Sequence, residues 1–274
     1  MKKRSRVGPA IAAWAFRILF AAFCVLPIYA SVIVALTPYA EIMRPQLVPL
    51  FWDFANFLGA ARFIAPRLAN SFFYSIASVA LALAIAVPSA YVLARYQFRG
   101  RRIVLFSLLL SQMMAGIVIM PSLYSIFNHL GFLNSRLGLI LVLTGVNLAL
   151  VVWILFGFLQ SLPREVEEAA MIDGASFLRM LLSVVVPISG PGIAVGAIFV
   201  FINTYNEFVI PLFLIANSKL FTITLSLYTL LTDTTIRWHI MAASSLIGMV
   251  LPIIVFTVFQ KYIVQGLTSG ALKG

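Results

Sequence analysis

Long apolar runs constrain the fold of this chain more than any other feature of its sequence. Runs of about 20 or more mostly apolar residues cover residues 10–36, 70–94, 103–126, 137–159, 190–215 and 238–264. A helix of about 20 apolar residues is long enough to cross the hydrocarbon core of a bilayer. Of the 274 residues, 62% are hydrophobic and only 10% are charged, which excludes a soluble globular protein with a polar surface. We therefore predict an all-α integral membrane protein with six transmembrane helices.

Basic residues give the expected orientation of these helices. Lys2, Lys3 and Arg4 precede the first run, which is longer than the roughly 7–15 apolar residues of a cleaved signal peptide, so we interpret it as a span. Four arginines follow the second run, and such clusters are typical of cytoplasmic loops: Arg95, Arg99, Arg101 and Arg102. We therefore expect both termini in the cytoplasm. The net charge of +11 is explained by this distribution, and we expect no nucleic-acid partner.

The sequence contains no pattern of an enzyme or a metal site. The single cysteine, Cys24, excludes an intrachain disulfide, and His129 and His239 have no partners at ligand spacing. A Walker A motif, a nucleophile elbow and a metalloprotease motif are all absent. We expect no catalytic residue, no metal and no cofactor bound by this chain. If ATP drives its activity, ATP and Mg must be bound by another subunit.

One polar segment, residues 162–189, interrupts the apolar pattern and holds four of the eight acidic residues. Pro163 suits a first helical turn, and Gly174 suits the left-handed conformation that ends a helix. We predict a short helix from about Pro163 to Asp173, with a stripe of mostly small residues at helical spacing: Val166, Ala169, Ala170 and Asp173. A second apolar stripe predicts another helix that ends at Pro187: Phe177, Met180, Leu181 and Val184.

Pattern alone leaves two interpretations of this segment: an ordinary connection between two spans, or a docking element. Glu168-Ala169-Ala170, Asp173-Gly174-Ala175 and Pro187, thirteen positions after Gly174, resemble the EAA loop of ABC importer permeases. In that family the loop carries a coupling helix that docks into a cleft on a cytoplasmic ATPase. The resemblance implies that Glu168 pairs with a basic residue of the ATPase, that Ala169 and Ala170 pack in its cleft, and that Gly174 forms the elbow.

Glu207 is the only acidic residue well inside a predicted span, where a charge costs at least about 2.5–3.5 kcal/mol. It is either a structural polar cap between helices or a residue of a translocation path. Tyr205-Asn206-Glu207-Phe208 resembles an aromatic-Asn-acid segment in the fifth helix of sugar-type ABC permeases. The second interpretation places further polar candidates along the path: Asn203, Tyr205, Asn206, Asn147 and Gln112.

The tail from Gln260 to Gly274 resembles the tail of the second permease of maltose-type systems. With the polar segment and the fifth-helix segment, this likeness identifies the chain as a member of the carbohydrate-type ABC importer permeases. It implies a type I ABC importer permease fold, one permease domain over residues 1–274, and a multi-pass location in a bacterial inner membrane. Implied partners are a second related permease, two ABC ATPase subunits and an extracytoplasmic solute-binding protein.

The solute class implied by the resemblance is broad and covers oligosaccharides, glycosides, polyols and glycerol-phosphate-type molecules. Two alternatives come from other classes of protein. One is an ion-coupled secondary transporter that uses Glu207 as its coupling carboxylate, which leaves residues 162–189 unexplained. The other is a scaffold without transport activity.

Overall fold

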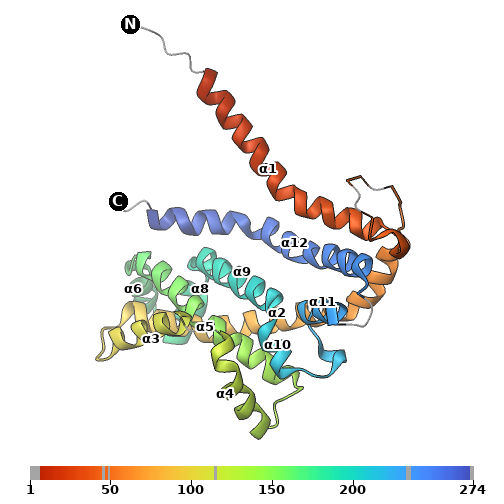
Figure 1. The fold of residues 1–274 in the computed structure, drawn as a ribbon. Coiled ribbons are helices and arrows are strands. Elements are labelled where there is room, and N and C mark those ends of the chain that lie inside the picture. The colour runs from red at the N-terminus through yellow and green to blue at the C-terminus, as the bar shows by residue number, and fades with distance from the viewer. Residues whose placement is uncertain (1–6, 45–46, 49, 114–115, 233–235, 272–274) are drawn as a thin grey trace. The chain divides into compact units, whose positions relative to one another are not determined.

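The computed structural model describes residues 7–44, 47–48, 50–113, 116–232 and 236–271, and all regular elements in these ranges are helical (Figure 1). This confirms the predicted all-α class. The elements in chain order are α1 (Val7–Leu36), η1 (Tyr39–Glu41), α2 (Ala55–Arg95), α3 (Arg101–Met113), α4 (Gly116–His129), α5 (Arg136–Ser161), α6 (Glu165–Ile172), α7 (Phe177–Met180), η2 (Leu181–Val185), α8 (Val186–Ile188), α9 (Gly190–Asn206), α10 (Val209–Leu214), η3 (Ser218–Leu220), α11 (Ile223–Thr232) and α12 (Trp238–Ala271).

Four of the described helices are long and apolar enough to cross a membrane. They contain the segments Ala13–Leu36, Ala55–Arg95, Arg136–Ser161 and Trp238–Tyr262. Two further spans result if α3 with α4, and α7–α8 with α9, each count as one broken span; the second of these pairs is bent by 79°. A total of six spans and cytoplasmic termini therefore stay predictions.

The second helix is longer than the sequence pattern indicated. The predicted span of residues 70–94 is the later part of α2, which begins at Ala55 and has 41 residues. Arg62 and Arg67 interrupt the apolar pattern there, although both are compatible with helical backbone. Hydropathy identifies residues suited to lipid and does not report helicity. It therefore does not detect the more polar first part of α2, before residue 70.

The described residues form two compact units, and each is considered by itself. Unit 1 comprises Met1–Ala65 and Leu227–Val250. Its small core consists of Ala35, Ala60 and Ala243, and beside it the Asn56 amide donates hydrogen bonds to the carbonyls of Ala35 (3.0 Å) and Thr37 (3.2 Å). Residues 13–30 of α1 are all exposed although most are apolar. This part of α1 is suited to contact lipid or another membrane protein.

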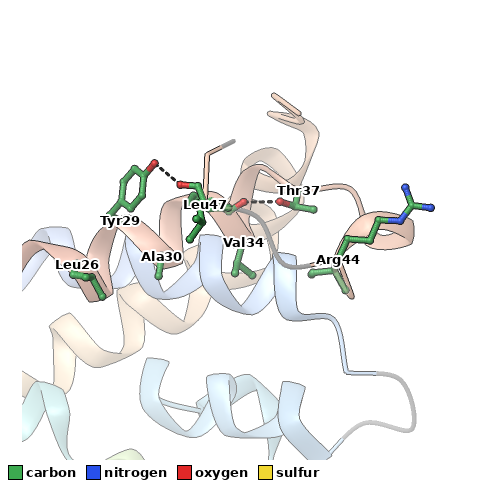
Figure 2. A pocket seen from close by; sticks show the side chains of 9 residues that line it. Leu26, Tyr29, Ala30, Val34, Thr37, Arg44 and Leu47 are labelled. Carbon is green, nitrogen blue, oxygen red and sulfur yellow. Dashed lines mark hydrogen bonds between the residues drawn. The ribbon is translucent and has the colours of Figure 1, made fainter. Parts of the chain in front are cut away.

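Unit 1 also contains a cavity of about 360 Å³ between the second half of α1 and the segment that follows it (Figure 2). Its lining is mostly apolar, and Figure 2 shows the Tyr29 hydroxyl donating to the carbonyl of Leu47, at 2.8 Å. This bond holds the following segment against α1. Arg44 stands at the edge of the lining and pairs with Glu41 at 3.0 Å.

Unit 2, comprising Pro66–Ser226 and Leu251–Gly274, holds the larger core. One buried cluster joins α2, α5 and α9 to the segment that follows α6. Helices α5 and α9 pack closely because two glycines, Gly192 and Gly196, face α5. A Cβ atom at Gly192 would lie 2.7 Å from Cγ of Phe158, and one at Gly196 would lie 3.1 Å from Cγ1 of Val151. This small-xxx-small spacing is a known means of bringing two membrane helices together.

Candidate functional site

Helix α6 is the short helix expected in the polar segment. It begins at Glu165 and ends at Ile172, slightly inside the predicted limits of Pro163 and Asp173. Its acidic first turn matches the positive end of the helix dipole. Gly174 has φ of +81°, and the N–H groups of Gly174 and Ala175 donate to the carbonyls of Met171 and Ala170, both at 3.1 Å. These paired bonds are a Schellman motif, which confirms the predicted end of the helix at a left-handed Gly174.

The two faces of α6 have different environments. Glu168, Ala169 and Asp173 are exposed, as is Ile172, whose side chain is 86% accessible. Ala170 is half-buried and packs against the chain's own core cluster. Of the predicted small-residue stripe, only Ala170 therefore faces inward. The exposed face combines an acid with small and apolar side chains, a composition suited to close contact with another protein.

Glu167 is the buried residue of α6, and sequence reasoning did not select it. Its carboxylate forms an ion pair with Arg95 in the last turn of α2, with 2.6 Å between Oε1 and Nη2. The side chains of Arg95 and Glu167 are 8% and 9% accessible. The hydrophobic pattern of the sequence assigns an acid to the exposed surface and therefore carries no signal for this buried pair.

The segment after the elbow is helical but irregular. Of the predicted apolar stripe, Met180 and Leu181 are buried and Phe177 is exposed, whereas the next fully buried residue is Val185 rather than Val184. Residues Leu181–Val185 form a π-helical turn, in which the N–H of Val186 bonds to the carbonyl of Leu181. A π turn inserts one residue into the helical repeat, so the buried face shifts by one position. Pro187, which has no N–H, lies just after this turn, and the helix ends at Ile188.

A second candidate site is a polar cavity of about 290 Å³ in unit 2, lined by residues of α3, α5, α9 and α10 and by Glu207. It brings together five of the six residues predicted for a translocation path: Gln112, Asn147, Asn203, Asn206 and Glu207. The Asn203 amide donates to Oδ1 of Asn147 at 3.1 Å, and Asn147 donates to the carbonyl of Leu143 at 2.7 Å. Tyr205, the sixth, does not line the cavity, because its ring is buried and stacks on Phe201.

Glu207 lies at a break between α9 and α10. Its Oε1 accepts hydrogen bonds from the N–H groups of Val209 (2.8 Å) and Ile210 (3.2 Å), which begin α10. Its backbone carbonyl accepts a bond from Oγ1 of Thr224 at 2.7 Å. The carboxylate therefore caps the second helix while it borders the cavity. This favours the structural role that the sequence left open, and it gives no support to Glu207 as a coupling carboxylate.

The structure describes only part of the basic residues that were predicted to be cytoplasmic and only part of the C-terminal tail. Residues 1–6 and 272–274 lie outside the described residues, as do parts of the predictions made for them. Within the described ranges, no group of three or more His, Cys, Asp and Glu side chains is placed to hold a metal ion.

Comparison with known proteins gives a consistent result. Residues 86–269 match the family model described as binding-protein-dependent transport system inner membrane component. The chain is 34% identical over 207 residues to the sulfoquinovosyl glycerol transport system permease protein SmoH of Agrobacterium fabrum, covering 76% of this chain and 73% of that protein. It is 29% identical over 262 residues to the trehalose/maltose transport system permease protein MalG of Thermococcus litoralis, covering 94% of each.

The diacetylchitobiose uptake system permease protein DasC of Streptomyces coelicolor is 32% identical over 257 residues, which cover 91% of this chain and 92% of that protein. Among solved structures, a crystal structure of a bacterial ABC transporter involved in the import of the acidic polysaccharide alginate contains a similar chain. The TM-score is 0.80, with 23% identity, and 96% of this chain and 99% of that chain are covered. This likeness confirms the predicted importer permease fold.

Proposed function

Because this chain belongs to the family of binding-protein-dependent transport system inner membrane components, we propose that it is the permease subunit of an ATP-driven importer for a sugar or sugar-like solute. It is a multi-pass protein of the inner membrane, and the family resemblance seen in the sequence is confirmed. The permease itself is not catalytic. ATP and Mg bind to two separate ABC ATPase subunits, and a second permease and an extracytoplasmic solute-binding protein complete the complex.

The exposed face of α6 carries this proposal. Ile172, at 86% accessible, and Met171, at 52%, are large apolar side chains on a short helix that also exposes Glu168. An apolar patch next to a charge is a common composition for a protein contact. We place this face in a cleft of the ATPase, with Glu168 paired to a basic residue there. Closure of the ATPases then displaces α6 and switches the spans from inward to outward access.

The polar cavity supports the assignment of the solute path. Its described lining offers four side-chain amides and one carboxylate, and no lysine or arginine belongs to it. Amides both donate and accept hydrogen bonds, which suits the hydroxyl groups of a sugar or polyol. Glu207 adds negative charge next to this surface, and a like charge on the solute is disfavoured there. We therefore propose an uncharged, polyhydroxylated solute.

The test is affinity purification of the chain from its native membrane in mild detergent, followed by mass spectrometry and an ATPase assay. We expect an ABC ATPase, a second permease and stimulation of ATP hydrolysis when the solute-binding protein is added with its solute. A panel of neutral oligosaccharides, polyols and acidic sugars then ranks the solutes. A chain that purifies without any ATPase contradicts the importer, whereas stimulation by acidic sugars alone contradicts only the proposed solute class.

A further inference from the structure

The contact between α6 and the end of α2 is formed by a network of directional hydrogen bonds and not by apolar packing alone. Nε of Arg95 donates to Oε1 of Glu167 at 2.8 Å, and Nη2 donates to the same oxygen at 2.6 Å. The Tyr91 hydroxyl donates to Oε2 at 3.0 Å, so both carboxylate oxygens have partners. A second donor bond from Nη2 reaches the carbonyl of Leu162, just before α6, at 3.2 Å.

The same residues also join the second half of the polar segment to α2. The ring of Tyr91 packs edge-on against Phe177 of α7, with 5.6 Å between the ring centroids. Its hydroxyl lies 3.9 Å from Sδ of Met180. Arg164, which precedes α6, donates to the carbonyl of Arg95 at 3.4 Å. Both sides of the glycine elbow therefore contact one turn of α2, between Tyr91 and Arg95.

Two physical arguments indicate that these contacts fix the direction of α6 and do more than stabilise the fold. A helix of eight residues is too short to hold its own conformation in water, so its direction depends on tertiary contacts. A buried ion pair contributes little net stability compared with apolar residues of similar volume, because both charges lose their hydration. Its distinctive property is directional, since a guanidinium and a carboxylate fit each other in a few orientations only.

We infer that Arg95 and Glu167, with Tyr91, form a clamp that transmits displacement of α6 to α2. Without the clamp, α6 acts on the spans through its covalent connections to α5 and to α7 and through the packing of Ala170 on the core cluster. With the clamp, α2 moves together with α6, and α2 packs against α5 and α9 in the same core cluster. This inference rests on the proposed function, because it concerns how force from the ATPase reaches the spans. Arg95 and Glu167 are positioning residues and do not contact the solute.

The decisive variant removes both charges together. In the complete importer reconstituted in proteoliposomes, R95M/E167M keeps an apolar contact without an unpaired buried charge. The measurements are the amount of ATPase bound per permease, the basal rate of ATP hydrolysis, and the solute transported per ATP hydrolysed. We expect normal assembly and basal hydrolysis, and a loss of about 3- to 30-fold in solute per ATP. Normal transport per ATP in this variant shows that the pair is merely structural and overturns the clamp.

Matched controls separate this result from general damage. Arg99→Gln removes an exposed arginine near the end of α2, and Arg102→Gln removes an exposed arginine in the first turn of α3. Both are expected to leave transport per ATP within twofold of the unchanged importer. A twofold change corresponds to a free-energy difference of about 0.4 kcal/mol. An equal loss in these controls contradicts the clamp, because it assigns the effect to charge on this surface rather than to the buried pair.

Arg95→Lys keeps the inference testable if the double variant does not assemble. Lysine keeps the charge but cannot bind the carboxylate in two places, so the pair loses its directionality. We expect assembly close to normal and an intermediate loss of transport per ATP. Full coupling in Arg95→Lys overturns the clamp. An unchanged chain that shows no solute-stimulated hydrolysis with its co-purified partners contradicts the proposed function itself, and the clamp with it.

Discussion

Glu167 and Glu168 are neighbours on α6, yet Glu167 is buried in an ion pair with Arg95 whereas Glu168 is exposed. Successive residues of a helix point about 100° apart, so one turn can serve two surfaces. The pair of acids divides α6 into a face that holds it on its own chain and a face that is free for another protein. This division yields two separable mutant phenotypes.

We predict that Glu168→Lys abolishes transport but leaves the permease as stable as the unchanged chain. Its side chain is exposed, so the substitution buries no charge, but it places a positive charge where the ATPase is proposed to be basic. Glu167→Lys instead places a second cation beside buried Arg95 and lowers the free energy of unfolding by about 3–5 kcal/mol. Uptake assays and thermal unfolding in detergent measure the two effects. Normal uptake by Glu168→Lys contradicts docking through this face.

The left-handed backbone at Gly174 gives a second prediction. A Cβ at Gly174 would meet no atom within 4 Å, so any effect of substitution comes from the backbone conformation. Gly174→Val is expected to cost about 1–2 kcal/mol, to distort the elbow and to reduce transport, whereas Gly174→Asn, which tolerates this conformation, retains most transport. Gly174→Pro is expected to abolish transport while the protein stays in the membrane.

Gly131, with φ of +71° and equally open surroundings, supplies the control for this experiment. Gly131→Val carries the same backbone strain outside the polar segment. It is expected to lower the unfolding temperature to a similar extent without lowering the solute transported per ATP. If both valine variants lose coupling equally, the elbow has no special role.

The sequence predicts α6 and its elbow well, because proline, acids and glycine are local signals that act within one or two turns. The buried face was not predictable in the same way. Glu167 is inside only because Arg95, in the last turn of α2 and 72 positions earlier in the chain, meets it there. A hydrophobic pattern assigns an acid to the surface, and it has no means of pairing two distant charges. From the sequence alone, Arg95 therefore serves only as a marker of membrane orientation.

The residues of the polar cavity, in contrast, could be predicted from the sequence. Polar side chains are rare inside spans because they are costly there, and they tend to face one another or a cavity. Five of the six candidates do meet. The motif makes Tyr205 a candidate together with Asn206, but the two side chains point about 100° apart on α9, and only Asn206 lines the cavity. The shift from Val184 to Val185 could not be predicted either, because the hydrophobic pattern does not mark the π turn over Leu181–Val185.

The cavity gives a third prediction. Asn206 is exposed and lines the cavity, so Asn206→Ala is expected to raise the KM for solute by about 2- to 10-fold, the effect of losing one hydrogen bond. Basal ATP hydrolysis is expected to stay unchanged. Asn128→Ala, which removes an exposed amide of α4 outside the lining, provides the control and should leave KM as it is. An unchanged KM in Asn206→Ala contradicts a solute path along this surface.

The close approach of α5 and α9 gives the last prediction. At Gly192 a Cβ would lie 2.7 Å from Cγ of Phe158, so a larger side chain forces the helices apart. Gly192→Val is expected to destabilise the permease by about 1–3 kcal/mol, through overpacking of the contact between α5 and α9. Gly157→Val is the matched control, since a Cβ at this exposed glycine of α5 meets nothing within 4 Å. Thermal unfolding in detergent compares the two variants. Equal unfolding temperatures would show that α5 and α9 adjust freely at Gly192, and would contradict the close packing that positions Asn203 beside Asn147.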